Sequence, residues 1–371
     1  MEVINIADCR YCSEVSKANQ EDPIGSAPQV DYWILVEFPQ PWPTAMFTEN
    51  PLVKQIIPLI KKLALERDIL VRPLAIAPDP EYSQSGYTRV IYYQRPGQKF
   101  AEYAKQEYIV PNDHASPLVM AILNRLLKQS GDLSQFTPYQ QDTQALREIL
   151  VCTHTQVDLA CGRYGTPVYR HLRQTYGQPD QPLRVWQSTH FGGHQFAPTL
   201  IDLPTGQFWG HLEMDVLPQL IHRNGDCHQM RRFYRGWTGM NRFEQIAERE
   251  AWMQQGWDWF TYPRTARTTG KGLTGQKRWL YPMLRLVPLK RLQVWLERWT
   301  RNASWADVDV IYDSPQGEGR YQARIEENGE VMSAFKSAAK PTDQVISKSV
   351  KQYRVSHVEF FPSQAPPCRD S

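Results

Sequence analysis

The sequence predicts an α/β protein, and two observations support this class. Short runs of β-branched and aromatic residues, typical of strands, alternate with amphipathic helical segments over the first 224 residues. The order strand, helix, strand, strand, helix is expected up to about residue 143 and again after it. This repeated order indicates two related α/β units in tandem, although the sequence shows no clear internal repeat.

Residues 1–143 form the first expected α/β domain. An apolar run at residues 31–37 is typical of a buried strand, and Asn50 with the proline after it begins a helix of periodic apolar residues. Strands are expected over residues 69–76 and 87–93, and a helix over residues 116–128.

Residues 144–224 form the second expected domain, in which a strand at residues 148–151 ends at Cys152. A helix over residues 162–176 is expected to stop at Gly177. Strands follow at residues 183–187 and 199–203, and the turn Pro204-Thr205-Gly206 returns the chain as a hairpin over residues 207–211. A closing helix is expected over residues 215–222.

Two further regions and a tail complete the chain. Residues 225–301 are predicted to be a basic, Trp-rich helical region, with a mobile loop at residues 265–275. Residues 302–362 are predicted to be a small β region, in which Asn328-Gly329 is a strong hairpin signal. Its strands are expected at residues 308–312, 320–326, 330–335 and 353–361, and residues 363–371 are expected to be a tail.

The charge is unevenly distributed along the chain. The net charge is +3, yet the segment from Arg231 to Arg301 carries 15 Lys/Arg and 5 Asp/Glu. Such a segment is either a solvated face or a binding surface for a phosphate-bearing ligand or an acidic partner, such as a protein redox partner. Tryptophan at helical spacing usually belongs to a core, so nucleic-acid binding is not expected.

Hydrophobic segments and cysteine content indicate the cellular location of the protein. No segment has the length of a membrane span, and the N-terminus lacks the basic and apolar regions of a secretory signal. Six cysteines spread over 371 residues are too sparse for a disulfide framework. We therefore expect a cytoplasmic protein without membrane contact, whose cysteines serve metal or redox chemistry.

The most informative pattern consists of two cysteines and two histidines. Cys152 and Cys161 are separated by eight residues, and His190 and His194 follow with Gly192 and Gly193 between them. Two thiolates and two imidazoles can hold Zn²⁺ tetrahedrally or a 2Fe–2S cluster with two ligands on each iron. Adjacent glycines favour a loop there and let the backbone approach a cluster closely.

One further histidine competes for a place in this ligand set. His154 follows Cys152 by two residues, and Cys-x-His is how the ligand pattern of Rieske proteins begins. Rieske proteins continue with Cys-x-x-His, whereas Tyr164 stands three residues after Cys161. We therefore prefer His190 and His194 as the imidazole ligands.

The stretches VCTHTQVDLACGRYGTPVYRHL and VWQSTHFGGHQFAPTLIDLPTGQFWGHL resemble the sucrase/ferredoxin-like family, as does CSEVSKANQEDPIGSA near the N-terminus. The resemblance covers about residues 9–222. It implies a thioredoxin-like 2Fe–2S ferredoxin domain at residues 144–224, in which two histidines replace the second cysteine pair. The preceding α/β domain is then also expected to be thioredoxin-like.

The resemblance also implies a ligand assignment and a function. Cys152 and Cys161 would bind one iron, and His190 and His194 the other, in a protein that transfers single electrons. Neutral imidazoles make reduction easier, with potentials of about −150 to +300 mV for Rieske centres against about −400 mV for plant-type ferredoxins. Proton uptake on the imidazoles could then accompany reduction.

Two other functions remain open at this point. The same four residues suit a structural zinc module in a scaffold protein. Cys9 and Cys12 form a C-x-x-C motif, the motif with which thioredoxin-like oxidoreductases carry out dithiol chemistry. No pair of carboxylates is placed for glycoside hydrolysis, so an electron carrier is favoured over a hydrolase.

Overall fold

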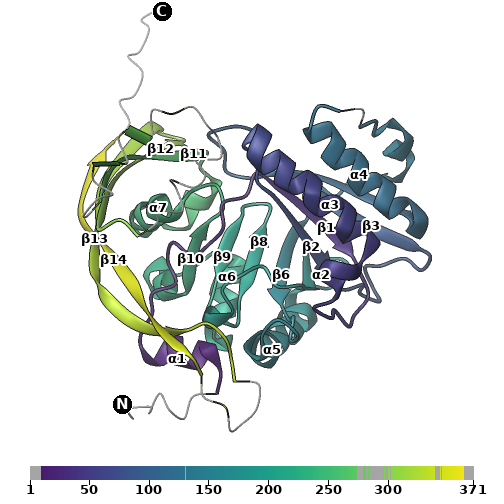
Figure 1. The fold of residues 1–371 in the computed structure, drawn as a ribbon, viewed down its shortest axis with the longest axis horizontal. Helices are drawn as coiled ribbons and strands as arrows, with labels where there is room; N and C mark the ends of the chain where they lie inside the picture. Colours follow the sequence, from purple (N-terminus) through teal and green to yellow (C-terminus); the bar gives the residue numbers. More distant parts are fainter. Residues whose placement is uncertain are drawn as a thin grey trace, which may run out of the picture.

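A computed structural model describes residues 10–129, 131–273, 279–280, 283–284, 287, 292, 296, 300, 302–338, 343 and 345–362. The predicted α/β class is confirmed. A large mixed sheet has the strand order β10-β9-β8-β6-β7-β2-β1-β3-β4-β5, and a second, antiparallel sheet has the order β11-β12-β13-β14. Figure 1 shows the large sheet in the middle of the molecule and the second sheet curving around α7.

The first half of the large sheet is built from residues 32–111. β1 (Tyr32–Glu37) pairs in parallel with β2 (Val71–Ile76), and antiparallel with β3 (Tyr87–Gln94), which pairs antiparallel with β4 (Ala104–Pro111). The helix α3 (Pro51–Lys62) connects the parallel strands, and α4 (Ala115–Leu126) follows the hairpin. Asn50 caps α3 by accepting hydrogen bonds from two backbone N–H groups, as its position before proline predicts.

The second half repeats this arrangement with other residues. β6 (Arg147–Cys152) pairs in parallel with β7 (Leu183–Ser188) and antiparallel with β8 (Leu200–Leu203), which pairs antiparallel with β9 (Gln207–Trp209). The helix α5 (Leu159–Tyr176) connects β6 to β7, and α6 (Leu217–His222) closes the unit. The strand orders β2-β1-β3-β4 and β7-β6-β8-β9 therefore agree with the tandem units expected from the sequence.

The two halves join along a short antiparallel contact between β2 and β7, at Ile76 and Ser188. Between the two halves, buried charges also pair with one another. Lys105 contacts Glu148 at 2.6 Å, and Arg184 contacts Glu107 at 2.9 Å. Removing one member of such a buried pair typically costs about 3–5 kcal/mol, so these pairs fix how the halves meet.

The remaining elements are short additions to the two sheet halves, or lie around the second sheet and at the ends of the chain. They are α1 (Cys12–Ala18), α2 (Met46–Glu49), β5 (Gln140–Gln141), β10 (Tyr234–Trp237), α7 (Arg242–Gln255), β11 (Arg264–Gly272), β12 (Trp305–Ser314), β13 (Gly317–Ala334) and β14 (Ser347–Phe361). Short 3-10 or π turns occur at Leu63–Arg67, Asn112–His114, Ser134–Tyr139, His194–Phe196, Met214–Val216, Cys227–Phe233 and Gly256–Thr261.

The predicted helical region at residues 225–301 differs from the structure in its described part. α7 is a helix, but β10 belongs to the large sheet and β11 to the second sheet. The expected mobile loop at residues 265–275 falls largely on β11, whose small and charged residues gave little strand signal. Trp237, Trp252 and Trp259 are fully buried, which confirms the core interpretation for these three. The interpretation is wrong for Trp279, which is 77% exposed, and Trp295 and Trp299 lie outside the described residues.

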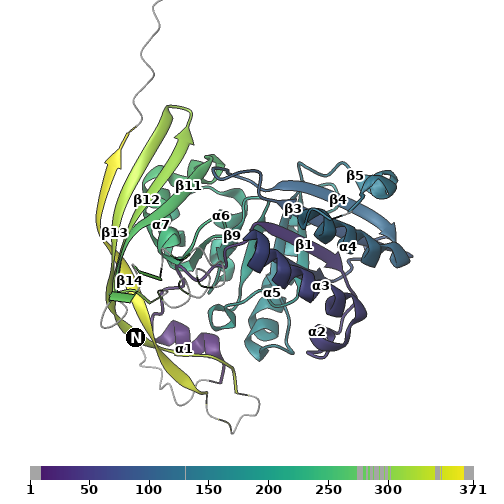
Figure 2. The ribbon, with the colours of Figure 1, turned by 45° about the horizontal axis from the view of Figure 1, so that its top comes forward.

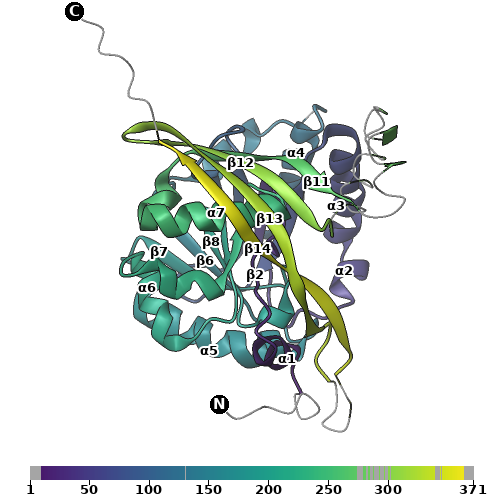
Figure 3. The same ribbon diagram turned by 90° about the vertical axis from the view of Figure 1, so that its left-hand side faces the viewer.

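The last hairpin of the chain reaches back to its beginning. β13 and β14 run as long neighbouring strands, and their lower end lies beside α1 (Figures 2 and 3). Ala338, which follows β13, donates its backbone N–H to the carbonyl of Arg10 at 2.9 Å. Residues more than 300 positions apart therefore meet next to the N-terminal helix. Among the described residues, no helix is long and apolar enough to cross a membrane.

Candidate metal centre

The four predicted ligands gather where β6 and β7 end. Cys152 is the last residue of β6, and Cys161 lies in the first turn of α5. His190 and His194 lie in or just after the loop that follows β7. Because β6 and β7 are parallel, their carboxyl ends meet at one edge of the sheet and bring these segments together.

Three of the four side chains are in direct contact. The Nδ1 atom of His190 lies 3.6 Å from the Sγ atom of Cys152 and 3.7 Å from that of Cys161. The rings of His190 and His194 have centroids 5.5 Å apart. Both cysteines are buried, so the described residues form a donor set largely shielded from water.

The site favours a thiolate. Burial raises the pKa of Cys152, but hydrogen bonds from Cys161 and His190, together with the charge of His190, outweigh it and hold that pKa well below its usual value. A sulfur that is already ionised is the form that binds a metal ion.

Two guanidinium groups lie beside the histidine loop. Arg235, on β10, is fully buried and donates to the carbonyl of Gly192 at 3.0 Å and to Ser26. Burial and the nearby Arg72 lower the pKa of Arg235 to about 9, against the raising effect of Cys152 and Cys161. Within the described part of the chain, neither guanidinium forms an ion pair with a carboxylate. The charge of Arg235 interacts with the thiol pair of Cys152 and Cys161 instead.

Two glycines allow the elements of the site to approach closely. Gly193 has φ of 78°, and a Cβ atom there would lie 2.2 Å from a guanidinium nitrogen of Arg235. A Cβ atom on Gly165 of α5 would lie 2.1 Å from the carbonyl oxygen of Cys152. These positions need glycine because the loop and the helix pack directly on charged or backbone atoms.

His154 has both ring nitrogens engaged by the backbone. Its Nε2 atom lies 2.7 Å from the carbonyl oxygen of Trp42, and its Nδ1 atom accepts the N–H of His190 at 3.3 Å. The preference for His190 and His194 over His154 is therefore consistent with the geometry. His154 instead orients the start of the histidine loop.

The sequence did not place Cys12, Asp158 or Ser337 at this site. The Sγ atom of Cys12 lies 3.2 Å from Nδ1 of His194 and 3.4 Å from Oδ1 of Asp158. Ser337, which follows β13, donates to Asp158 at 2.6 Å. Asp158 could have been predicted as the N-cap of α5 from its position before a helix, but its contacts with residues from both ends of the chain could not.

The C-x-x-C motif is only half described, because Cys9 lies outside the described residues. The pKa of Cys12 is raised to about 12. Burial is the main cause and the charge of Asp158 adds to it, while a hydrogen bond from Ser337 offsets part of the rise in this pKa. Dithiol chemistry requires a thiolate near neutral pH. The surroundings of Cys12 therefore disfavour it as the attacking thiol of a thioredoxin-like oxidoreductase.

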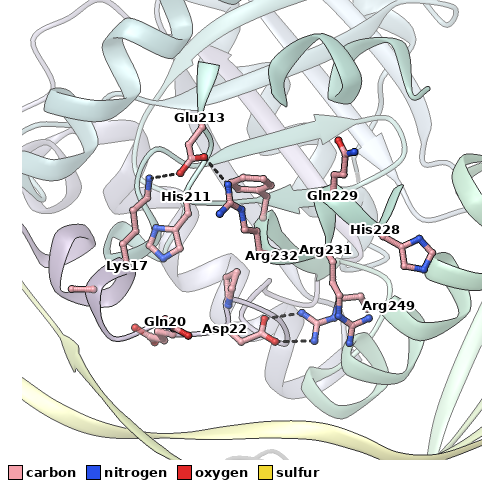
Figure 4. Close-up of a pocket in the computed structure, with 14 residues that line it drawn as sticks. Lys17, Gln20, Asp22, His211, Glu213, His228, Gln229, Arg231, Arg232 and Arg249 are labelled. Carbon is pink, nitrogen blue, oxygen red and sulfur yellow. Dashed lines mark hydrogen bonds and ion pairs between the residues drawn. The ribbon is translucent and has the colours of Figure 1, made fainter. Parts of the chain in front are cut away.

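A cavity of about 1080 Å³ lies next to the C-terminal end of α1 (Figure 4). It is connected to the metal centre through α1, because Ser16 contacts Nε2 of His211 at 3.0 Å, one helical turn after Cys12. Its cations are paired with carboxylates: Arg249 contacts Asp22 at 2.7 Å and Arg232 contacts Glu213 at 2.7 Å. These pairs neutralise part of the excess charge of the basic segment, and we assign no ligand to the cavity.

Comparison with known proteins identifies the family. The profile of the family described as Sucrase/ferredoxin-like matches residues 23–236, which is more than half of the chain. The protein therefore belongs to the sucrase/ferredoxin-like family. Neither a curated protein nor a solved structure matches the chain. The matched range contains Cys152, Cys161, His190 and His194 and ends within β10.

Proposed function

We propose that this protein transfers single electrons by means of a 2Fe–2S cluster held by Cys152, Cys161, His190 and His194. The observation that carries the proposal is the convergence of these four residues at the ends of β6 and β7, with sulfur and nitrogen atoms 3.6 and 3.7 Å apart. Family membership supports it, because the matched range includes all four.

The donor chemistry fits such a cluster. Two thiols and two imidazoles are the ligand types that Rieske-type centres use, with the imidazoles on one iron and the thiolates on the other. His190 lies against the two sulfurs in this structure, so it would have to shift away from them for the cluster to fit between. When bound, the cluster supplies one-electron transfer.

The surrounding residues have separate tasks in this proposal. The buried thiols of Cys152 and Cys161 hold the cluster away from water. Arg235 and Arg72 place positive charge beside the histidine loop, which favours the more negative, reduced state. His190 and His194 are both partly exposed, His194 with 19% of its side chain, and bring the site towards the surface.

A zinc site is a second candidate, and a specific distance favours it. With Zn–S of about 2.3 Å and Zn–N of about 2.0–2.1 Å, a tetrahedral zinc ion places its sulfur and nitrogen ligands about 3.5 Å apart. The distances of 3.6 and 3.7 Å from Nδ1 of His190 to the two sulfurs are close to this sulfur–nitrogen distance. Cys152, Cys161 and His190 would then hold zinc, with a fourth ligand still to be supplied.

Absorption and EPR spectra of anaerobically purified protein distinguish the two candidates. A 2Fe–2S protein is red-brown when oxidised and gives an EPR signal after one-electron reduction, whereas a zinc protein is colourless and EPR-silent. A coloured protein whose reduced EPR signal disappears in Cys152→Ser supports the electron carrier. A colourless protein, purified with the iron–sulfur assembly machinery present, would contradict it.

An electron carrier requires a partner, and we propose a protein with an acidic surface. The proposal depends on the basic segment that begins at Arg231, although Arg231, Arg249 and Arg267 already contact carboxylates. If the segment steers association, the association rate falls steeply as salt is raised beyond 0.1 M, where the Debye length is about 10 Å. A rate unaffected by salt would leave the segment as a solvated face.

A further inference from the structure

Three segments that are far apart in the sequence meet at Asp158. Its side chain caps α5 by accepting the backbone N–H of Ala160 at 2.9 Å. It also accepts the backbone N–H of Ser337 at 2.9 Å and the hydroxyl of Ser337 at 2.6 Å. The Cys12 thiol donates to the same carboxylate at 3.4 Å. The carboxylate thus ties α1 and the segment after β13 to the helix that carries Cys161.

This network determines which nitrogen of His194 carries the proton. A thiol has one proton, and that of Cys12 is directed to Asp158. With the thiol proton directed to Asp158, the Cys12 sulfur is an acceptor for Nδ1 of His194, which lies 3.2 Å away. The carboxylate of Asp158, 3.5 Å from the same nitrogen, can only accept and favours the same arrangement. In a neutral imidazole with Nδ1 protonated, the lone pair available to a metal is on Nε2.

We propose that Cys12 and Asp158 are positioning residues for His194, holding its Nδ1–H so that Nε2 is the nitrogen presented to the metal. The inference rests on the proposed function, in which His194 is a ligand. Metal-binding histidines generally donate their other ring N–H to a carboxylate or carbonyl, which fixes the tautomer and raises the basicity of the ligand. Here the thiol of Cys12 and the carboxylate of Asp158 both lie beside Nδ1, at 3.2 and 3.5 Å.

The arrangement assigns a role to parts of the chain outside the two sheet halves. α1 supplies Cys12, and the end of the long C-terminal hairpin supplies Ser337, whose hydroxyl also accepts the N–H of Cys12 at 3.1 Å. Both segments lie together in the views of the molecule (Figures 2 and 3). In this proposal, Cys12 and Ser337 position the metal-binding side chain of His194 and do not bind the cluster themselves.

Substitutions at Cys12 separate a positioning role from a ligand role. Cys12→Ser keeps a group that can accept from His194 and donate to Asp158, whereas Cys12→Ala keeps neither. Cys227→Ala is the matched control, because Cys227 is another buried thiol near a histidine, with its sulfur 4.0 Å from Nδ1 of His228. Asp158→Asn removes the charge while asparagine remains a good N-cap for α5.

The first readout is the midpoint potential of the cluster in each variant. Loss of the acceptor weakens the ligand basicity of His194, so Cys12→Ala and Asp158→Asn should shift the potential upward. Cys12→Ser and Cys227→Ala should keep the wild-type value. Equal potentials in Cys12→Ala and Cys227→Ala would overturn the inference, as would loss of the cluster in both Cys12→Ser and Cys12→Ala, which would make Cys12 a ligand.

The second readout needs no cluster. In metal-free protein, ¹⁵N NMR of histidine should show His194 as the Nδ1–H tautomer in the wild type and a mixture of tautomers in Cys12→Ala. An Nε2–H tautomer in the wild type would overturn the inference. If the wild type holds no iron but shows the expected tautomer, the proposed function fails while the positioning of His194 stands.

Discussion

The two halves of the large sheet share one topology and differ at the ends of their parallel strands. In the second half, β6 and β7 end at Cys152 and at the loop with His190 and His194. In the first half, the corresponding loops after β1 and β2 line a cavity of about 790 Å³, and its described lining residues include neither cysteine nor histidine. The fold is thus repeated, while the candidate metal ligands lie at one edge of the second half.

The first half still contributes to the site in the second. Arg72 of β2 lies near Gly192, and the carbonyl of Trp42 contacts His154, which in turn holds the backbone of His190. These contacts explain why two halves in one continuous sheet serve a single centre. The comparison predicts that substitutions at the ends of β6 and β7 abolish metal binding, and that those in the first half modulate it.

The largest effect is expected from the thiols. Cys152→Ser or Cys161→Ser should lose the cluster, because a hydroxyl is a poor substitute for a thiolate on iron. Cys227→Ser serves as the control, since Cys227 is a buried cysteine away from the strand ends and should keep full iron content. The measurement is iron per chain after anaerobic purification. Retained iron in both Cys152→Ser and Cys161→Ser would place the centre elsewhere.

Equivalent loops of the two halves give a second comparison. Gly86, after β2, has φ of 83° and open space around a built Cβ atom, whereas Gly193, after β7, has φ of 78° with Arg235 at 2.2 Å. Gly86→Ala should cost about 1–2 kcal/mol in free energy of unfolding, the strain of a left-handed residue. Gly193→Ala should cost more and reduce iron content, because Arg235 must also move. Equal losses of stability, measured by denaturant unfolding, would contradict the close packing.

Arg235 should set part of the reduction potential. Arg235→Gln removes a buried positive charge and should lower the potential, since reduction adds negative charge to the cluster. Arg235→Lys retains the charge and should stay closer to the wild type. Redox titration of both variants tests this expectation, and a potential that does not depend on the charge at this position would speak against it.

The smallest effect is expected from pH. If reduction of a histidine-ligated centre is accompanied by proton uptake, the potential should fall by about 59 mV per pH unit above the pKa of the oxidised state. His190→Cys, which adds a thiolate and removes an imidazole, should have a lower potential and a shallower slope. A redox titration between about pH 5 and pH 10 brackets the usual range of histidine pKa values. A flat wild-type profile would argue against imidazole ligands.

Much of the fold follows from local sequence patterns, and the exceptions have physical causes. Asn50 was predictable because helix caps require particular residues. The hairpin expected at Asn328-Gly329 is wrong: both residues lie inside β13, where the register with β14 shifts between Glu327 and Glu330, so the glycine serves a bulge rather than a turn. The strand β11 was missed because its partners in the second sheet, rather than its own small residues, hold it in place. Nothing in the local sequence indicated that β10 would join the edge of the large sheet.

The proximity of the four candidate ligands was predictable from the sequence, and their surroundings were not. Cys152, Cys161, His190 and His194 have a recognisable spacing, which the fold brings together. Arg235 was counted only as part of a basic segment, although it is buried beside the histidine loop. Cys12 was noticed for a motif with Cys9, but its partners are Asp158 and His194, which only the tertiary structure reveals.

Metal and sulfide content per chain tests the central claim most directly. The protein is purified anaerobically from cells with active iron–sulfur assembly, and iron, zinc and acid-labile sulfide are counted against protein. The account predicts about two irons and two sulfides per chain, the content of one 2Fe–2S cluster, and almost none of either in Cys152→Ser. Stoichiometric zinc without iron or sulfide in the wild type would contradict it.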